Sequence, residues 1–507
     1  RNIVKTIKNE AVKMFMALMF TLLPLYYTDN YYYILDDKNI IFEIFSKIII
    51  TVIGSLLVIH LIWDIYKKKL GTDIKAEVSK TNALDITMIL FLVATIFSLI
   101  HTNNFETSFD GSAAWLVGGY ALIIGVVLYF IISRFFSGKA DVWAYLLLGS
   151  LAVIVIGILD RFGNDFLVMH DEIPYSWNIF ISTIGNVNFW AAFLSMIIPF
   201  FMLVPIFLKS RGYRVLVYLF LGVSYFSLFI VLTNTSYIGI GTALLFIVWY
   251  SLKDMKRLKN LAFEGIVFSF VGAIAEYLWK NPNTFARPMD VDTISYVLLN
   301  YRLYFLPGIL GVAVIFFLLV EDRLSEEKRT RVKHFVENVL SKIWIGFICA
   351  GVGGVVVYVA SNYSLELFNY RGSIWYFSFH GFMDGSAGDK LIGVGPGLLD
   401  SVTRPQIENA SFFVEWDYLY NTAHNDVLEY LVTMGIVGAV LKVVMYIVPF
   451  VMFAKRKNNE AQKAAVLAAL VGYMGQGMIT GPYLFVYVFY IIFLGAFSAY
   501  DRMEQIS

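Results

Sequence analysis

The chain has 507 residues, of which 59% are hydrophobic and only 15% carry a charge. Soluble domains carry charge on about a quarter of their residues, so this composition excludes a soluble globular protein and favours a polytopic membrane protein. The formal net charge of +1 excludes a basic nucleic-acid-binding surface. The single cysteine, Cys349, excludes an internal disulfide and a cysteine-based metal site, and we expect neither metal nor cofactor.

Apolar runs long enough to cross a hydrocarbon core of ~30 Å predict an all-α polytopic membrane protein with about fourteen transmembrane helices. We expect residues 1–507 to form a single transmembrane domain. The predicted spans are 13–28, 40–66, 83–101, 115–136, 141–159, 183–208, 213–233, 236–252, 262–279, 296–320, 341–361, 425–455, 463–480 and 482–500.

Every second connection between these spans is rich in lysine and arginine, as at Lys67–Lys69, Arg134–Lys139 and Lys455–Lys463. Short cytoplasmic loops are enriched in these residues, so the alternation predicts that both termini are cytoplasmic. It also predicts that residues 362–424 form a large extracytoplasmic loop. At roughly sixty residues, this loop is longer than ordinary connections and is a candidate for function.

The loop ends at His424, which we expect at the tip of the helix 425–455. At 3.6 residues per turn, one face of that helix is predicted to carry His424, Leu428, Leu431, Gly435 and Gly438. The helix dipole disfavours a protonated ring there and leaves a neutral imidazole able to accept a proton. Asn425 offers an oxygen to the first turn. A histidine in this position is also commonly a helix cap or a packing residue.

Two further features of the loop have a functional and a structural interpretation. Arg371 shares a helical face with Trp375, as in an interfacial helix, but its guanidinium fork also suits a phosphate or pyrophosphate. Gly393, Gly395 and Gly397 mark an irregular turn, which would also bring backbone amides close to an anion or a sugar.

Other candidates lie earlier in the chain. Asn186 and Asn188 open the predicted span 183–208 and either hydrogen-bond a glycan or cap the helix. Arg302 falls within the apolar span 296–320, where a charge usually has a partner or a function.

Taken in order, these motifs resemble the O-antigen ligase and O-antigen polymerase superfamily of bacterial envelope glycosyltransferases. The resemblance covers mainly the second two-thirds of the chain and is carried by Gly185–Asn188, Arg371 with Trp375, Leu391–Gly397, Ala423–Asp426 and Gly435–Gly438.

The resemblance implies a GT-C-like architecture in the bacterial cytoplasmic membrane and a role in polysaccharide biosynthesis of the cell envelope. A glycan would move from a polyprenyl pyrophosphate carrier, such as undecaprenyl pyrophosphate, to a hydroxyl of an acceptor glycan or glycolipid. The reaction would be inverting, metal-independent and extracytoplasmic. By position, His424 would activate the acceptor hydroxyl and Arg371 would hold the pyrophosphate.

One position departs from the family, because Tyr237 stands where an arginine is usual. Arg302 is our first expected substitute and Arg287 the second, both as binding residues for the donor.

Two other functions remain open. A lipid-linked oligosaccharide flippase or other secondary transporter would show inverted repeats and polar groups near the midplane. A peptidoglycan-type polymerase would depend on an acidic residue, with Glu415 or Asp417 as the candidate.

Overall fold

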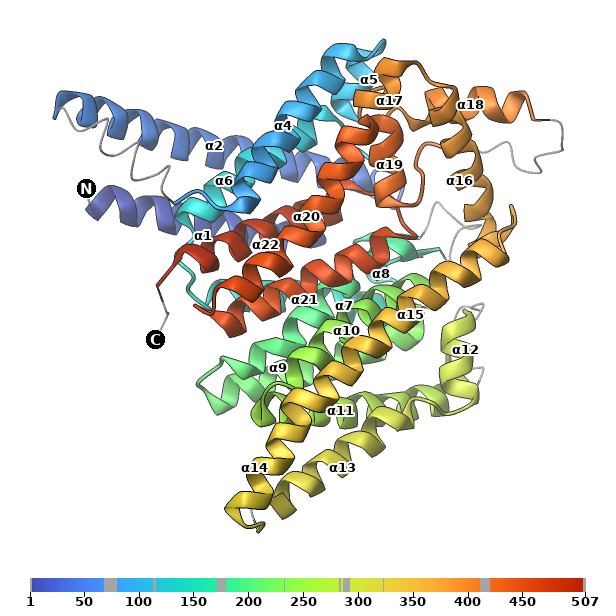
Figure 1. Ribbon diagram of the computed structural model, residues 1–507. Helices are drawn as coiled ribbons and strands as arrows, with labels where there is room; N and C mark the ends of the chain where they lie inside the picture. Colours follow the sequence, from blue (N-terminus) through green and yellow to red (C-terminus); the bar gives the residue numbers. More distant parts are fainter. Residues whose placement is uncertain are drawn as a thin grey trace. The chain divides into compact units, whose positions relative to one another are not determined.

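The computed structural model of the chain describes residues 2–67, 80–112, 115–170, 179–231, 233–281, 284–285, 292–321, 323–410 and 420–504. Throughout these ranges the fold is helical, as predicted (Figure 1). A single short antiparallel pair of strands interrupts the described helices: β1 (Phe180–Ile181) and β2 (Gly185–Asn186).

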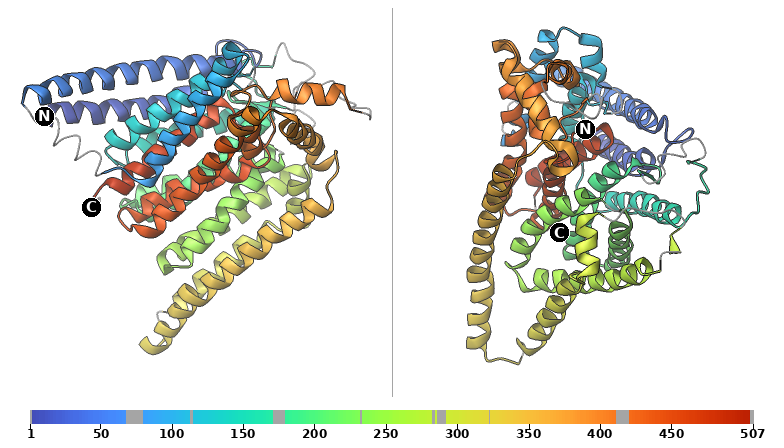
Figure 2. Two further views of the ribbon diagram at one scale, coloured as in Figure 1. Left: turned by 45° about the horizontal axis from the view of Figure 1, so that its top comes forward. Right: turned by 90° about the vertical axis from the view of Figure 1, so that its right-hand side faces the viewer.

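The chain divides into two compact units. The first comprises residues 1–150, 365–470 and 477–507. Its main helices are α1 (Asn2–Leu25), α2 (Ile34–Tyr66), α4 (Ala83–His101), α5 (Phe105–Asp110), α6 (Gly119–Phe135), α16 (Leu367–Asp384), α17 (Ala387–Ile392), α18 (Leu399–Glu408), α19 (Asp426–Thr433), α20 (Gly435–Lys455) and α22 (Leu484–Arg502). Helix α22 is buried along its length and packs against α1, α2, α6 and α20 (Figure 2). A helix that is apolar on all sides is typical of a bundle centre.

The second unit comprises residues 151–364 and 471–476, so that α7 (Val142–Arg161) and α21 (Glu460–Gly477) each contribute to both units. Its other helices are α8 (Val187–Leu203), η1 (Val204–Ile206), α9 (Arg211–Val231), α10 (Asn234–Ser251), α11 (Met255–Trp279), α12 (Thr293–Asn300), α13 (Phe305–Glu321), α14 (Glu326–His334), η3 (Phe335–Leu340) and α15 (Ser341–Ser361). The buried helix α8 packs against α9 and α10. Small residues let α11 and α13 approach closely: a Cβ on Gly311 would lie 2.3 Å from the Ala262 carbonyl oxygen.

Nine of the described helical segments are long and apolar enough to cross a membrane, or ten if α12 and α13, bent by 57°, form one span. The chain is therefore a multi-pass membrane protein, but the predicted number of fourteen spans is wrong. Helix α1 carries Lys5, Lys8, Glu10 and Lys13, and α6 has only 17 residues. Polar side chains lower the hydropathy of α10 and α21, so these four helices do not qualify.

The predicted helix 425–455 is also wrong as a single element, because α19 ends at Thr433 and α20 begins at Gly435. Gly435 has a φ of +67° and a Cβ there would lie 2.3 Å from the Leu391 backbone. Only glycine allows both the left-handed conformation and this close approach. His424 and the residues after the break therefore do not share one continuous helical face.

The predicted long loop 362–424 contains three helices in its described part: α16, α17 and α18. Helix α16 packs against α18 and α19, and α17 packs against α4 and α20. These contacts attach the loop to α4, α19 and α20, and α19 begins two residues after His424.

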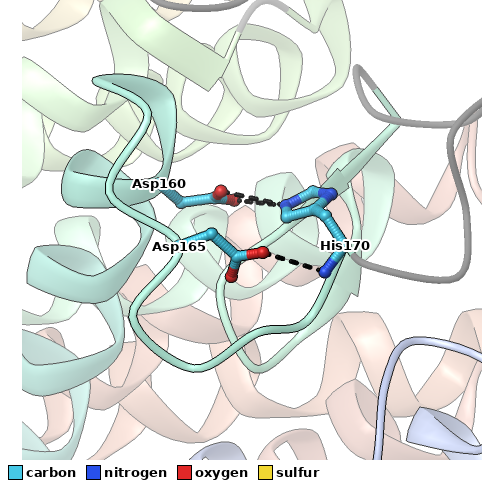
Figure 3. A group of neighbouring side chains, drawn as sticks. All are labelled: Asp160, Asp165 and His170. Atoms are coloured by element: carbon cyan, nitrogen blue, oxygen red, sulfur yellow. Dashed lines mark hydrogen bonds and ion pairs between the residues drawn. The ribbon is translucent and has the colours of Figure 1, made fainter.

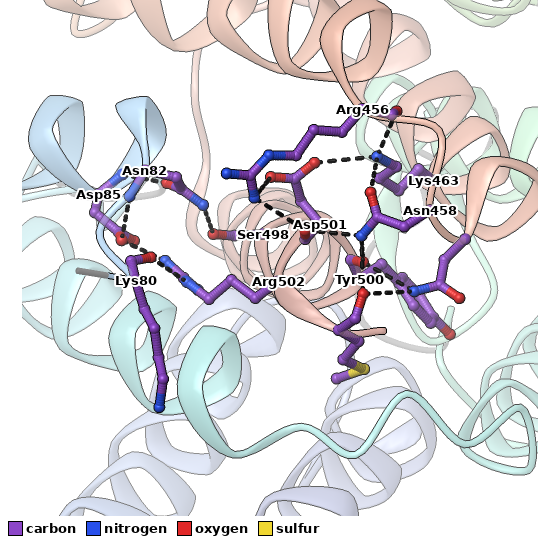
Figure 4. Close-up of polar contacts among 12 residues, drawn as sticks. Lys80, Asn82, Asp85, Arg456, Asn458, Lys463, Ser498, Tyr500, Asp501 and Arg502 are labelled. Atoms are coloured by element: carbon purple, nitrogen blue, oxygen red, sulfur yellow. Dashed lines mark hydrogen bonds and ion pairs between the residues drawn. The ribbon is translucent and has the colours of Figure 1, made fainter. Parts of the chain in front are cut away.

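Basic side chains gather at one end of the first unit (Figure 4). Asp501 pairs with Lys463 at 3.0 Å and with Arg456 at 3.3 Å, and Asp85 pairs with Arg502. Arg456 lies in the connection after α20, and Lys463 lies in the first turn of α21. Asp501 and Arg502 end α22, and Asp85 lies in the first turn of α4.

The opposite end of the same unit carries the loop helices. Helix α4 has 19 residues, or about 28 Å at 1.5 Å per residue, and runs from the basic cluster to His101. His101 hydrogen-bonds Asp389 of α17 at 2.9 Å. The loop helices and the basic cluster therefore lie at opposite ends of a helix about as long as a hydrocarbon core is thick.

Candidate functional site

His424 lies in the turn before α19, next to the cap residue Asn425. The Asn425 side-chain oxygen accepts a hydrogen bond from the Leu428 amide at 3.0 Å, which confirms the predicted cap. Its Nδ2 atom donates to the Met478 carbonyl at 3.0 Å. His424 has a φ of +47°, a conformation that non-glycine residues rarely adopt. The turn therefore holds the ring in a direction that a regular helix would not give it.

Glu429 holds the same turn from the first turns of α19. Its carboxylate accepts hydrogen bonds from the Ala423 amide at 2.7 Å and from the Thr422 hydroxyl at 3.2 Å. Burial raises the pKa of Glu429 to about 7, although both hydrogen bonds act in the opposite direction. A carboxyl group that changes protonation near neutral pH thus supports the turn that carries His424.

The imidazole of His424 lies edge-to-face with Trp115, with ring centroids 5.4 Å apart. Trp115 is fixed in turn by a hydrogen bond from Nε1 to the Asn421 side-chain oxygen at 2.9 Å. Trp115 and Asn421 also line a small cavity together with Glu429 and Gly397. The buried Nδ1 of His424 has no hydrogen-bond partner among the described residues. Burial thus leaves this ring nitrogen without a described partner that would fix the tautomer of the imidazole.

The ring of His424 is held neutral. Burial lowers its pKa, and the positive charge of Arg371 acts in the same direction, so that together they bring it to about 3. A neutral imidazole is the form that accepts a proton, as the sequence predicts for this position.

Arg371 lies in the first turns of α16. Its Nε donates to the Ile479 carbonyl at 2.6 Å and its Nη1 donates to the Phe368 carbonyl at 2.9 Å. The remaining nitrogen, Nη2, makes no hydrogen bond to a described residue. Burial lowers the pKa of Arg371, but an arginine remains charged at any physiological pH. The guanidinium is thus oriented by two backbone carbonyls and keeps donor capacity for an anion.

The glycine turn has a structural role that the sequence did not separate from a binding role. Gly393, Gly395 and Gly397 have φ values of +79°, +121° and +73°. The Gly395 amide donates to the Thr433 carbonyl at 3.0 Å, and a Cβ on Gly393 would lie 2.2 Å from the Thr433 backbone. The turn thus packs against the break between α19 and α20. Gly397 alone of the three lines the cavity beside Trp115.

A buried ion pair fixes α19 against α20. Asp426 accepts from Lys442 at 2.9 Å, and both side chains are about 1% exposed. The Tyr446 hydroxyl also donates to Asp426. The Lys442 ammonium lies 5.0 Å from the ring of Tyr430 and 4.6 Å from that of Tyr490. The charge is therefore neutralised and enclosed by aromatic faces, directly after the turn that carries His424.

Asn186 and Asn188 belong to the second unit, where both serve the start of α8. The Asn186 side chain accepts from the Asn188 amide at 2.8 Å and caps the helix. The Asn188 side-chain oxygen accepts from the Thr233 hydroxyl at 3.1 Å and from Thr235 at 3.4 Å. Of the two interpretations open for this pair, the described contacts favour capping.

Arg302 does not lie inside an apolar helix, and that prediction is wrong. It lies in the turn between α12 and α13, with a φ of +54° and a side chain 61% exposed. Its Nε donates to Glu276 at 3.0 Å. The bend of 57° between the two helices moves this charge out of a continuous span. Arg302, like Asn186 and Asn188, belongs to a different unit from His424 and Arg371.

A second histidine and two carboxylates meet after α7 (Figure 3). His170 pairs with Asp160 at 2.9 Å, and Asp165 accepts from the backbone amides of Met169 and His170, each at 3.0 Å. Their candidate ligand atoms lie within 4.8 Å of one another, as a metal site requires. The donors and acceptors satisfy one another as a folded turn, so we assign this group a structural role.

The sequence did not predict Trp115, Glu429 or Lys442 as site residues. Glu429 and Lys442 are charged residues inside the apolar segment 425–455. A charge within an apolar segment was the reason for selecting Arg302, and the same reasoning would have selected these two residues. Trp115 resembles an interfacial anchor and gives no such signal. Glu415, Asp417 and Arg287 lie outside the described residues.

No model of a known protein family matches this sequence, and no curated protein matches it either.

Proposed function

We propose that the chain is an extracytoplasmic glycosyltransferase of the O-antigen ligase or polymerase type. It would move a glycan from a polyprenyl pyrophosphate carrier to a hydroxyl of an acceptor glycan. The observation that carries this proposal is that Arg371 and the His424 turn are held at adjacent backbone carbonyls, those of Ile479 and Met478, so that the arginine charge acts on a neutral imidazole. Both groups lie at the end of the first unit that is opposite the basic cluster.

In the proposed reaction, an acceptor hydroxyl donates its proton to the imidazole of His424. The hydroxyl oxygen forms a bond to the anomeric carbon of the donor, and the bond from that carbon to the pyrophosphate oxygen breaks. Attack from the face opposite the leaving group inverts the anomeric centre. Arg371 stabilises the negative charge that develops on the leaving pyrophosphate, a role that oriented guanidinium groups commonly have.

The contacts of Arg371 suit this role. The backbone carbonyls of Ile479 and Phe368 accept hydrogen bonds from Nε and Nη1. The guanidinium is therefore already oriented before the donor binds, and binding does not cost the entropy of ordering it. A neutral imidazole with a pKa near 3 is a weak base, but a pyrophosphate bound at Arg371 offsets the positive charge that lowers this pKa. Donor binding would thus increase the basicity of His424 before proton transfer.

Transfer by purified protein in proteoliposomes, with a polyprenyl pyrophosphate glycan as donor, tests the proposal. We expect His424→Ala to reduce the rate about 10²–10⁴-fold, the usual contribution of a general base. His380→Ala is the matched control, because His380 is exposed and stacks on Tyr376 of its own helix. If the His424→Ala variant transfers glycan at the wild-type rate, the proposed mechanism is wrong.

A further inference from the structure

An open groove runs beside the His424 turn, between the end of α4 and the three loop helices. Its volume of about 410 Å³ falls within the range for small-molecule sites. We call it the acidic groove and define it by six of its lining residues: His101, Asn103, Asp384, Asp389, Ser401 and Gln406.

Two side-chain pairs brace the walls of the acidic groove. His101 of α4 contacts Asp389 of α17 at 2.9 Å, and Gln406 of α18 donates to Asp384 of α16 at 2.8 Å. Each pair joins two separate elements, so the polar groups are held in place before any ligand binds. Asn103 is exposed and contributes a side-chain amide at the mouth.

The floor of the acidic groove is continuous with the packing under His424. Phe382 and Val402 line the groove and pack against a buried cluster that contains Leu399, Ala423 and Val432. Ala423 directly precedes His424 in the chain. The groove and the turn that carries the proposed base therefore pack against the same buried cluster.

The charge of the lining is one-sided. Asp384 and Asp389 are its acidic residues, and among the described residues no lysine or arginine lines it. Arg404, the nearest basic residue along α18, pairs with Asp400 at 2.8 Å and is not part of the lining. A chain of uronic acids or phosphates would meet the carboxylates of Asp384 and Asp389, whose negative charge disfavours it.

We propose that the acidic groove binds the acceptor and that this acceptor is an uncharged glycan. Carboxylate, amide and hydroxyl groups recognise sugar hydroxyls, which both donate and accept, and Phe382 and Pro405 offer apolar surfaces to the sugar faces. This inference rests on the proposed transferase function. The two substrates would then be separated by charge, with the anionic carrier at Arg371 and the neutral acceptor in the groove.

Binding to an array of neutral and uronic-acid-containing bacterial oligosaccharides tests the inference without requiring catalysis. We expect the purified protein to retain neutral oligosaccharides and to exclude acidic ones. The double variant Asp384→Ala/Gln406→Ala should bind about tenfold or more weakly, since it removes two polar contacts. Asn103→Ala, which alters no described hydrogen bond, should also weaken binding and excludes misfolding as the cause. Glu408→Ala, on α18 but outside the groove, should bind as the wild type does.

Two readouts separate this inference from the proposed function. His424→Ala should keep its oligosaccharide binding even though transfer is lost, because the groove does not include His424. An active transferase whose groove variants keep the wild-type acceptor KM would overturn the inference and leave the function intact. Retention of acidic oligosaccharides alone, or of none at all, would also overturn it.

Discussion

A histidine that must accept a proton has conflicting requirements when an arginine lies close to it. The positive charge of Arg371 and the burial of the ring both keep His424 neutral, but the same two effects make it a weak base. A bound anion would offset the arginine charge, the smaller of these two effects. The imidazole would then be more basic with the pyrophosphate donor bound than in the resting site.

Glu429 gives a prediction about pH at the same scale. Its pKa is raised by burial to about 7, and it lies in α19, outside the membrane-spanning segments. The folded state therefore holds a proton that the unfolded chain releases near pH 4.3. The stabilising contribution of the protonated carboxyl is complete below that pH and is lost as the pH rises to about 7, by at most about 4 kcal/mol.

We expect the thermal stability of the detergent-solubilised protein to fall between about pH 5 and pH 8. Glu429→Gln keeps an acceptor for the Ala423 amide but cannot ionise, so it should remove much of this fall. Glu408→Gln, an exposed substitution, should leave the pH dependence unchanged. Equal pH dependence in the wild type and Glu429→Gln would show that this carboxyl is not the titrating group.

At the scale of elements, the break between α19 and α20 decides where His424 points. The short helix α19 is held by Glu429 at its turn, by Gly393 against its last residue and by the Asp426 to Lys442 pair across the break. An eight-residue helix has little stability of its own, so these contacts determine its position.

The buried pair gives a stability prediction. Lys442→Met would leave Asp426 buried without its counterion, which typically costs about 3–5 kcal/mol. The double variant Asp426→Asn/Lys442→Met removes both charges and keeps an acceptor for Tyr446, so it should lose less stability than the single variant. Thermal denaturation of the solubilised protein measures this, and we expect the single variant to unfold at a lower temperature than the double variant.

The matched control is Arg404→Met, which breaks the exposed pair with Asp400 and should cost less than about 1 kcal/mol. If Lys442→Met is no more destabilising than Arg404→Met, the pair does not hold α19 in place.

The sequence predicted helices well and their interruptions poorly. Hydropathy placed 83–101 at the bounds of α4, because a long apolar run has only one stable form in a membrane. It could not place the break at Gly435, because that break depends on a contact with the Leu391 backbone, far away in the chain. Nor could it count spans, since α1 and α21 carry polar and charged residues within apolar helical segments. The cap at Asn425 was predictable because it is local, whereas the contact of Trp115 with His424 is not.

At the scale of the whole molecule, the placement of charge within the first unit gives a direction across the membrane. Arg456, Lys463 and Arg502 gather at one end, and the acidic groove lies at the other. Basic ends of membrane bundles are typically cytoplasmic. This direction would place His424 outside the cell, where no nucleoside triphosphate is present and the energy of the carrier pyrophosphate bond is the suitable driving force.

Cysteine labelling in intact bacteria tests this direction, because the chain has a single cysteine that can be removed as Cys349→Ala. In that background we place Asn409→Cys directly after α18 and Lys457→Cys beside the basic cluster, both at exposed positions. The positive-inside asymmetry predicts that a membrane-impermeant maleimide labels residue 409 in intact cells and residue 457 only after permeabilisation. Retained transfer activity in both variants controls for correct folding. The reverse pattern would place His424 on the cytoplasmic side and contradict an extracytoplasmic transferase, and labelling of both positions in intact cells would contradict the assignment of the two ends to opposite sides.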